Sequence, residues 1–169
     1  MNRVIVLVMH GMTPSDFPQD EKKEFMRLHT QVHTNSDSDP DFVRRHDELE
    51  NKMRHWPRSE QNDPFCMAAM QLAESMEQQS GQKVFLGFNE FCAPSFESAI
   101  ASAVDSGPEE VCVVTPMVTR GGVHSEVEIP EIIEKAKADY PNIKFSYAWP
   151  YDPDHTAEFL LNQISRSSK

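Results

Sequence analysis

The chain has 169 residues, and its 27 acidic side chains outnumber its 16 lysine and arginine side chains, for a formal net charge of -11. This length is typical of one domain with a complete apolar core. The acidic balance argues against nucleic acid as a partner, because phosphate binding needs a basic face. No apolar run approaches the roughly 18 residues that cross a bilayer, so no membrane segment is predicted.

The first predicted element is a strand over residues 3–9, an uninterrupted apolar run rich in β-branched side chains. Such a run is typical of a strand buried on both faces of a parallel sheet. No cleavage-site pattern follows it, so we interpret it as a strand and not as a signal peptide. His10 and Gly11 come directly after this strand.

Residues 13–63 differ from the rest of the chain, because they are polar and hold four of the seven histidines. Two helices are predicted here, over 21–32 and 41–55, with a loop or helix start over 35–40. Helical spacing places six apolar side chains inward: Phe25, Leu28, Val32, Phe42, Leu49 and Met53. His46 and His55 are predicted to be solvated surface residues.

Helices and strands alternate in the remainder of the chain. Asp63 as N-cap and Pro64 in the first turn open a helix that ends at Gly81. Further strands are predicted over 83–88, 110–116 and 143–148, and further helices over 95–106, 126–139 and 155–165. Leu72 is predicted to face inward in the helix that ends at Gly81. Phe159, Leu160 and Ile164 are predicted to face inward in the helix over 155–165. Asp154 is predicted to cap the last helix.

This alternation predicts an α/β fold, a three-layer sandwich around a four-stranded parallel sheet with right-handed crossovers. A flavodoxin-like strand order of 2-1-3-4 makes the first and third strands neighbours at the topological switch point. Ligands bind there, at the carboxyl ends of the strands. Because His10 and His124 follow these two strands, we expect them to meet.

Two neutral imidazoles at one sheet edge can hold a divalent metal ion, accept protons, or do both. The loop before His124 adds Arg120, whose guanidinium is a fork for a carboxylate, and Gly121-Gly122, which permit close backbone approach. Each residue also has a structural interpretation. His10 then only completes a turn, and Arg120 is a solvated loop residue.

Three loop motifs together resemble the CbiX/SirB family of class II chelatases. They are His10-Gly11, then Phe88-Asn89-Glu90-Phe91 with Ala93-Pro94-Ser95, then Gly121-Gly122-Val123-His124 with Ile129-Pro130. The resemblance covers residues 1–12 and about 64–169. It implies a lyase that inserts Co²⁺, Fe²⁺ or Ni²⁺ into sirohydrochlorin or a related tetrapyrrole, as in cobalamin or siroheme biosynthesis.

The resemblance also implies the roles of individual residues. His10 and His124 hold the metal and take up pyrrole protons. Glu90 is a third ligand, a proton acceptor or an orienter of a histidine, although a carboxylate that caps the next turn is equally consistent with its position. Arg120, Gly121 and Gly122 contribute to tetrapyrrole binding. The metal is a substrate, and no organic cofactor is needed.

A single chelatase half implies the short form of the family, in which a homodimer encloses the macrocycle. The cysteines Cys66, Cys92 and Cys112 are widely spaced and form no CxxC motif, which favours free thiols in a reducing cytoplasm and not a disulfide framework. We therefore expect a cytoplasmic homodimer.

Two features depart from the family pattern. Glu126 and Glu128 follow His124 where many members have basic residues, which favours metal capture over binding of a polyanionic tetrapyrrole. Residues 13–63 are longer than the usual link, so we interpret them as a helical insertion within one domain over 1–169. This insertion is a lid, a dimerisation arm or a simple addition. Its His29 and His33, at i and i+4, are either a metal-binding pair or part of an exposed polar face.

Two further functions stay open. A non-catalytic relative that binds a divalent metal or a tetrapyrrole is favoured by the acidic residues after His124 and by the insertion. A histidine phosphatase or mutase also places His-Gly after its first strand. That class needs an arginine just before the histidine, where this chain has Met9.

Overall fold

The computed structural model of this chain describes residues 2–34 and 39–167, with the side chains of all of these except His33 and Thr34. Most of the predicted loop over 35–40 and the side-chain role predicted for His33 therefore lie outside the described residues. None of the helices in the described ranges has both the length and the apolar character that a bilayer crossing requires.

The sheet has four parallel strands in the order β2-β1-β3-β4. They are β1 (Arg3–Met9), β2 (Val84–Phe88), β3 (Glu110–Val114) and β4 (Lys144–Tyr147). Met9 pairs with Phe88 on one side of β1, and Leu7 pairs with Val114 on the other. The predicted strand order is confirmed, and the loops after β1, β2 and β3 leave the sheet at the same edge.

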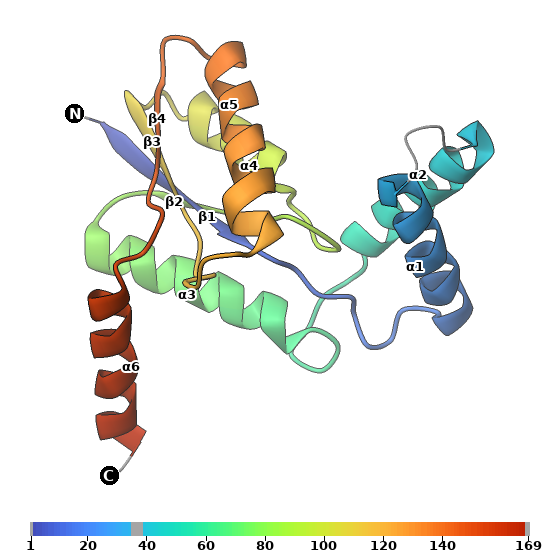
Figure 1. Cartoon of the computed structure of the whole chain (residues 1–169), viewed down its shortest axis with the longest axis horizontal. Coiled ribbons are helices and arrows are strands. Elements are labelled where there is room, and N and C mark those ends of the chain that lie inside the picture. The colour runs from blue at the N-terminus through green and yellow to red at the C-terminus, as the bar shows by residue number, and fades with distance from the viewer. Residues whose placement is uncertain (1, 35–38, 168–169) are drawn as a thin grey trace.

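Helices cover both faces of this sheet (Figure 1). One apolar cluster joins the sheet to α4 (Phe96–Asp105) and α5 (Ile129–Asp139). A second cluster joins the opposite face to α3 (Pro64–Ser80). The three-layer α/β sandwich is therefore confirmed. As predicted, Asp63 caps α3 by accepting a hydrogen bond from the Cys66 amide at 3.0 Å, and Gly81 ends that helix in a left-handed conformation.

Two helices within residues 13–63 pack against each other beside the sheet, and we call them the helical hairpin (Figure 1). They are α1 (Gln19–Thr34) and α2 (Pro40–Arg54). Their core consists of Phe17, Phe25, Leu28, Leu49 and Met53. Phe42, predicted to face inward, is 40% exposed, because its ring lies under the guanidinium of Arg27 at 5.9 Å and not in that core.

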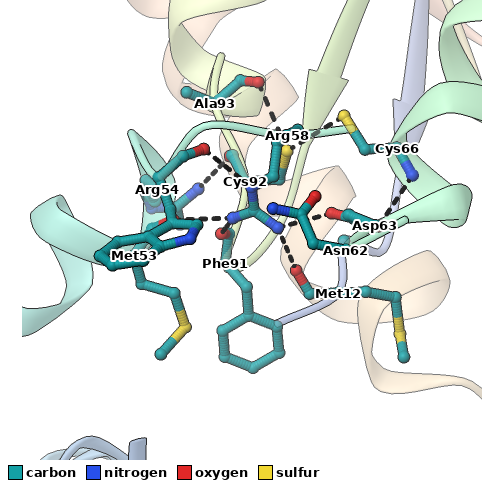
Figure 2. A network of polar contacts seen from close by, with 12 residues as sticks. Met12, Met53, Arg54, Arg58, Asn62, Asp63, Cys66, Phe91, Cys92 and Ala93 are labelled. Atoms are coloured by element: carbon teal, nitrogen blue, oxygen red, sulfur yellow. Dashed lines mark hydrogen bonds and ion pairs between the residues drawn. The ribbon is translucent and has the colours of Figure 1, made fainter. Parts of the chain in front are cut away.

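Arg58 joins the hairpin to the rest of the molecule (Figure 2). Its guanidinium donates to the carbonyl oxygens of Met12, Met53 and Phe91 and is paired with the Asp63 carboxylate at 2.5 Å. The side chains of Arg58 and Asp63 are both buried. One buried ion pair therefore connects the loop after β1, the end of α2, the loop after β2 and the start of α3.

The last helix, α6 (Pro153–Ser167), extends away from the sheet (Figure 1). The prediction that its apolar side chains face inward is wrong, because Phe159, Leu160, Leu161 and Ile164 are 53–67% exposed. Its cap was also assigned to the wrong residue, since the carboxylate of Asp152, and not that of Asp154, accepts hydrogen bonds from the first turn. In α3, Leu72 is likewise 39% exposed, because it faces away from the sheet.

Candidate metal centre

His10, Glu90 and His124 meet at the carboxyl edge of the sheet. One ligand atom of each lies within 4.8 Å of the others. The rings of His10 and His124 are perpendicular with centroids 4.5 Å apart, and Nε2 of His10 is 3.8 Å from Glu90 Oε2. The three side chains are 21–40% exposed, so a ligand can reach them. The structure thus brings together the three residues that were predicted to be catalytic, whereas Arg120, Gly121 and Gly122 are not part of this cluster.

Backbone contacts place Glu90 beside His10. The amides of Asn89 and Glu90 donate to the carbonyls of Met9 and His10, both at 2.9 Å, and so continue the β1–β2 pairing past the strand ends. Gly11 has a φ of +103°, and a Cβ at this position would collide with the carbonyl oxygen of Glu90. Glycine after His10 is therefore required by this close approach.

The hydrogen-bond partners of the two histidines determine which ring nitrogen faces the site. His10 Nδ1 lies 2.7 Å from the Gly11 carbonyl oxygen, which only accepts, so Nδ1 carries the hydrogen. His124 Nδ1 lies 2.6 Å from Glu128 Oε2. Because an ionised carboxylate also only accepts, Nδ1 of His124 carries the hydrogen as well. In the neutral rings the Nε2 lone pairs of both histidines are left to bind a metal or accept a proton.

His124 begins a π-helical turn, η1 (His124–Glu128), that runs directly into α5. The Tyr147 hydroxyl donates to the Ser125 carbonyl oxygen at 3.0 Å and holds this turn against β4. Burial raises the pKa of Tyr147 to about 12, so the hydroxyl remains a donor at neutral pH. The helix predicted over 126–139 therefore begins earlier, because His124 and Ser125 are already part of it.

The two acidic residues after His124 both have partners. Glu128 contacts His124, and Glu126 pairs with Arg120 at 2.9 Å, which lowers the pKa of that carboxyl. Neither carboxylate is a free charge at the site. Arg120 is well exposed, and Gly121 has a positive φ of 91° with open space around it. The loop that was predicted to bind the tetrapyrrole is thus accessible.

The hairpin brings two further histidines near this centre. His29 Nε2 lies 3.8 Å from Glu90 Oε1, and His29 Nδ1 lies 3.1 Å from His46 Nε2. The prediction that His46 is solvated is wrong, because it is 4% exposed and stacks on Phe25. His55 is exposed as predicted. Sequence reasoning missed the pair because nothing in the spacing of His29 and His46 shows that their helices pack together.

The fold and the site define a class: a parallel α/β domain with two imidazoles and a carboxylate at its switch point, which are side chains that could hold a divalent metal ion. The CbiX family model matches residues 59–167. The chain belongs to the CbiX family.

Sequence and structural relatives agree with this assignment. The chain is 32% identical over 83 residues to the sirohydrochlorin cobaltochelatase of Priestia megaterium, covering 48% of this chain and 27% of the relative. It is 33% identical over 63 residues to the sirohydrochlorin cobaltochelatase of Methanopyrus kandleri, covering 37% of this chain and 43% of that protein. The matches thus span less than half of either relative. A CbiX protein from Marinobacter aquaeolei VT8 shares the fold, with a TM-score of 0.57 and 16% identity over 98% of this chain and 96% of that one.

Proposed function

We propose that this chain is a chelatase that inserts Co²⁺, Fe²⁺ or Ni²⁺ into sirohydrochlorin or a related tetrapyrrole. The observation that carries the proposal is the cluster of His10, Glu90 and His124 within 4.8 Å at an accessible sheet edge. The names of the relatives from Priestia megaterium and Methanopyrus kandleri support the choice of substrate.

In this proposal His10 and His124 hold the metal ion as a substrate through Nε2. Two imidazoles bind a borderline divalent ion but leave most of its coordination sphere open, so the macrocycle nitrogens can replace them. Insertion breaks two pyrrole N–H bonds and forms metal–nitrogen bonds without electron transfer. Glu90, 3.8 Å from His10, accepts a released proton together with the histidines. No organic cofactor takes part.

Arg120, Gly121 and Gly122 are proposed to contact the carboxylate-bearing macrocycle. Arg120 exchanges its Glu126 partner for a substrate carboxylate, which the high exposure of its side chain supports. Residues 13–63 are proposed to be an insertion within a single domain over residues 1–169. The free cysteines fit a cytoplasmic protein.

A homodimer is proposed from the last helix. An exposed apolar surface on α6 is formed by Phe159, Leu160, Leu161 and Ile164. Grouped apolar residues of this kind are typical of interaction surfaces, whereas single exposed ones are not. A second copy of the chain can cover this surface, and the family resemblance implies that such a homodimer encloses the macrocycle.

The test is an anaerobic absorbance assay of sirohydrochlorin with each of the three metals. We expect metallation well above the spontaneous rate, abolished in the His10→Ala/His124→Ala double variant and retained in the His55→Ala control. Absence of acceleration with every metal, in a folded protein that still binds Co²⁺, would favour a non-catalytic metal-binding relative instead.

A further inference from the structure

The Glu90 carboxylate lies between two imidazoles from different parts of the chain. Its Oε2 is 3.8 Å from His10 Nε2, at the end of β1, and its Oε1 is 3.8 Å from His29 Nε2, on α1 of the hairpin. Phe91, the next residue, contacts both rings, with centroids 6.2 Å from His10 and 6.0 Å from His29. The hairpin therefore reaches the metal centre through His29.

The orientation of His29 is fixed by a second imidazole. His29 Nδ1 is 3.1 Å from His46 Nε2, and His46 Nδ1 is 3.0 Å from Asp47 Oδ1. Because the Asp47 carboxylate only accepts, His46 Nδ1 carries a hydrogen, and in the neutral ring Nε2 accepts from His29 Nδ1. This arrangement leaves His29 Nε2 as the atom that faces Glu90.

Packing alone does not account for these histidines. The other core residues of the hairpin are apolar, and His46 is 4% exposed among them. A buried imidazole has a desolvation cost that an apolar side chain of similar size avoids. The rings also lie close together, with His29 5.3 Å and His46 5.2 Å from Phe25 between centroids. A series of polar contacts thus runs through the hairpin from Asp47 to His46 and His29 and ends at Glu90.

From this geometry we infer that His29 is a positioning residue for Glu90, held in place by His46 and Asp47. The hairpin then contributes to the metal centre by fixing the carboxylate that lies 3.8 Å from Nε2 of His10. The inference rests on the proposed function, because Glu90 acts there as a proton acceptor. It assigns a role to residues that precede the segment matched by the family model.

A double-mutant cycle on chelatase turnover tests the inference. His29→Ala is expected to lower kcat about tenfold with KM for sirohydrochlorin unchanged within about twofold, since a small misplacement of a reacting group costs rate. In a Glu90→Gln background the same substitution is expected to change kcat by less than about twofold, because it acts through Glu90. Additive losses, or no loss in His29→Ala alone, would overturn the inference.

Two further variants separate positioning from folding. His29→Gln keeps a polar group that reaches toward Glu90 and is expected to recover most of the lost kcat. His29→Phe fills the same space without a polar atom and is expected to stay as slow as His29→Ala. The matched control is His55→Ala at the C-terminal end of α2, an exposed residue whose Nδ1 lies 2.9 Å from the Asn51 carbonyl oxygen. Equal activity of the Gln and Phe variants would contradict the inference.

An activity-independent measurement distinguishes this inference from the proposed function. In histidine-ring NMR spectra, Glu90→Gln is expected to shift the ring signals of His29, and the exposed Glu97→Gln control is not. If the wild type metallates no tetrapyrrole but the His29 ring signals still shift in Glu90→Gln, the chelatase proposal is rejected. The contact between His29 and Glu90 is then retained. An unmoved His29 signal in Glu90→Gln would overturn the inference whatever the activity.

Discussion

His124 Nδ1 lies 2.6 Å from Glu128 Oε2, four residues further along the same helical turn. This carboxylate fixes the ring and its tautomer, so that in the neutral ring the Nε2 lone pair is left to bind a metal. Glu128→Gln is expected to weaken Co²⁺ binding about tenfold, since loss of a carboxylate behind a metal-binding histidine has effects of this size. Calorimetric titration with Co²⁺ measures the affinity. The exposed Glu131→Gln on α5 is the control, and equal affinities of the two variants would contradict this role of Glu128.

Gly11→Ala tests the close approach of the loops after β1 and β2. The substitution introduces a Cβ that meets the Glu90 carbonyl oxygen and strains a backbone at φ +103°. We expect the free energy of unfolding in urea to fall by about 3 kcal/mol. Gly107→Ala, at φ +74° but in open space, is the matched control and is expected to lose about 1 kcal/mol. Similar losses at both positions would show that the contact with Glu90 is unimportant.

Arg58→Met is expected to destabilise the protein by about 3–5 kcal/mol, because it leaves the Asp63 carboxylate buried without its partner. Asp63→Asn added to this variant removes the unpaired charge and keeps an oxygen for the α3 cap, so it is expected to restore part of the loss. Chemical denaturation of the wild type, both single variants and the double variant measures the coupling. Strict additivity would mean that the pair does not act as a unit.

Leu161→Glu tests the exposed apolar surface of α6. If a second copy covers this surface, a charge in its middle is expected to convert a dimer into a monomer without loss of helical circular dichroism. Light scattering after size exclusion gives the mass. Glu158→Gln on the same helix is the control. A wild-type protein that is monomeric at every accessible concentration would rule out the homodimer.

The buried thiol of Cys92 predicts a loss of stability at alkaline pH. Burial raises the pKa of Cys92 to about 12, whereas an unfolded thiol has a pKa of about 8.5. Above pH 9 the unfolded chain loses this proton and the folded chain keeps it, so stability is expected to fall between about pH 9 and 12. Urea unfolding of Cys92→Ser is expected to have a shallower pH dependence than the wild type. Cys112→Ser serves as the control, and parallel curves for all three proteins would contradict the prediction.

The sheet and the centre of the site follow directly from the sequence. Buried strands in an alternating pattern allow few topologies, and a parallel sheet brings the loops after its central strands together. The meeting of His10 and His124 was therefore predictable without any contact being known, whereas Glu90 was assigned from the family resemblance. Gly11 was recognisable as a turn residue, but its close approach to Glu90 depends on the register of two strands 75 residues apart in the sequence.

The hairpin and the last helix were less predictable, for different reasons. His46 and Phe42 lie on the same amphipathic helix, and which of them is buried depends on how α1 crosses α2, which the spacing does not specify. For α6 the apolar stripe itself was recognised, but a helical stripe indicates only that something covers it. Within the described residues nothing of this chain does, so the expected intramolecular packing was wrong.

The backbone pairing beyond the ends of β1 and β2 has a consequence for the kinetics of the site. The amides of Asn89 and Glu90 are bonded to Met9 and His10 as an extension of the sheet ladder, and β1 is an inner strand of that sheet with neighbours on both sides. Hydrogen exchange at these amides therefore requires breaking the bonds that extend the β1–β2 ladder. The relative position of His10 and Glu90 is thus set by backbone pairing, and we expect it to persist as long as β1 and β2 stay paired.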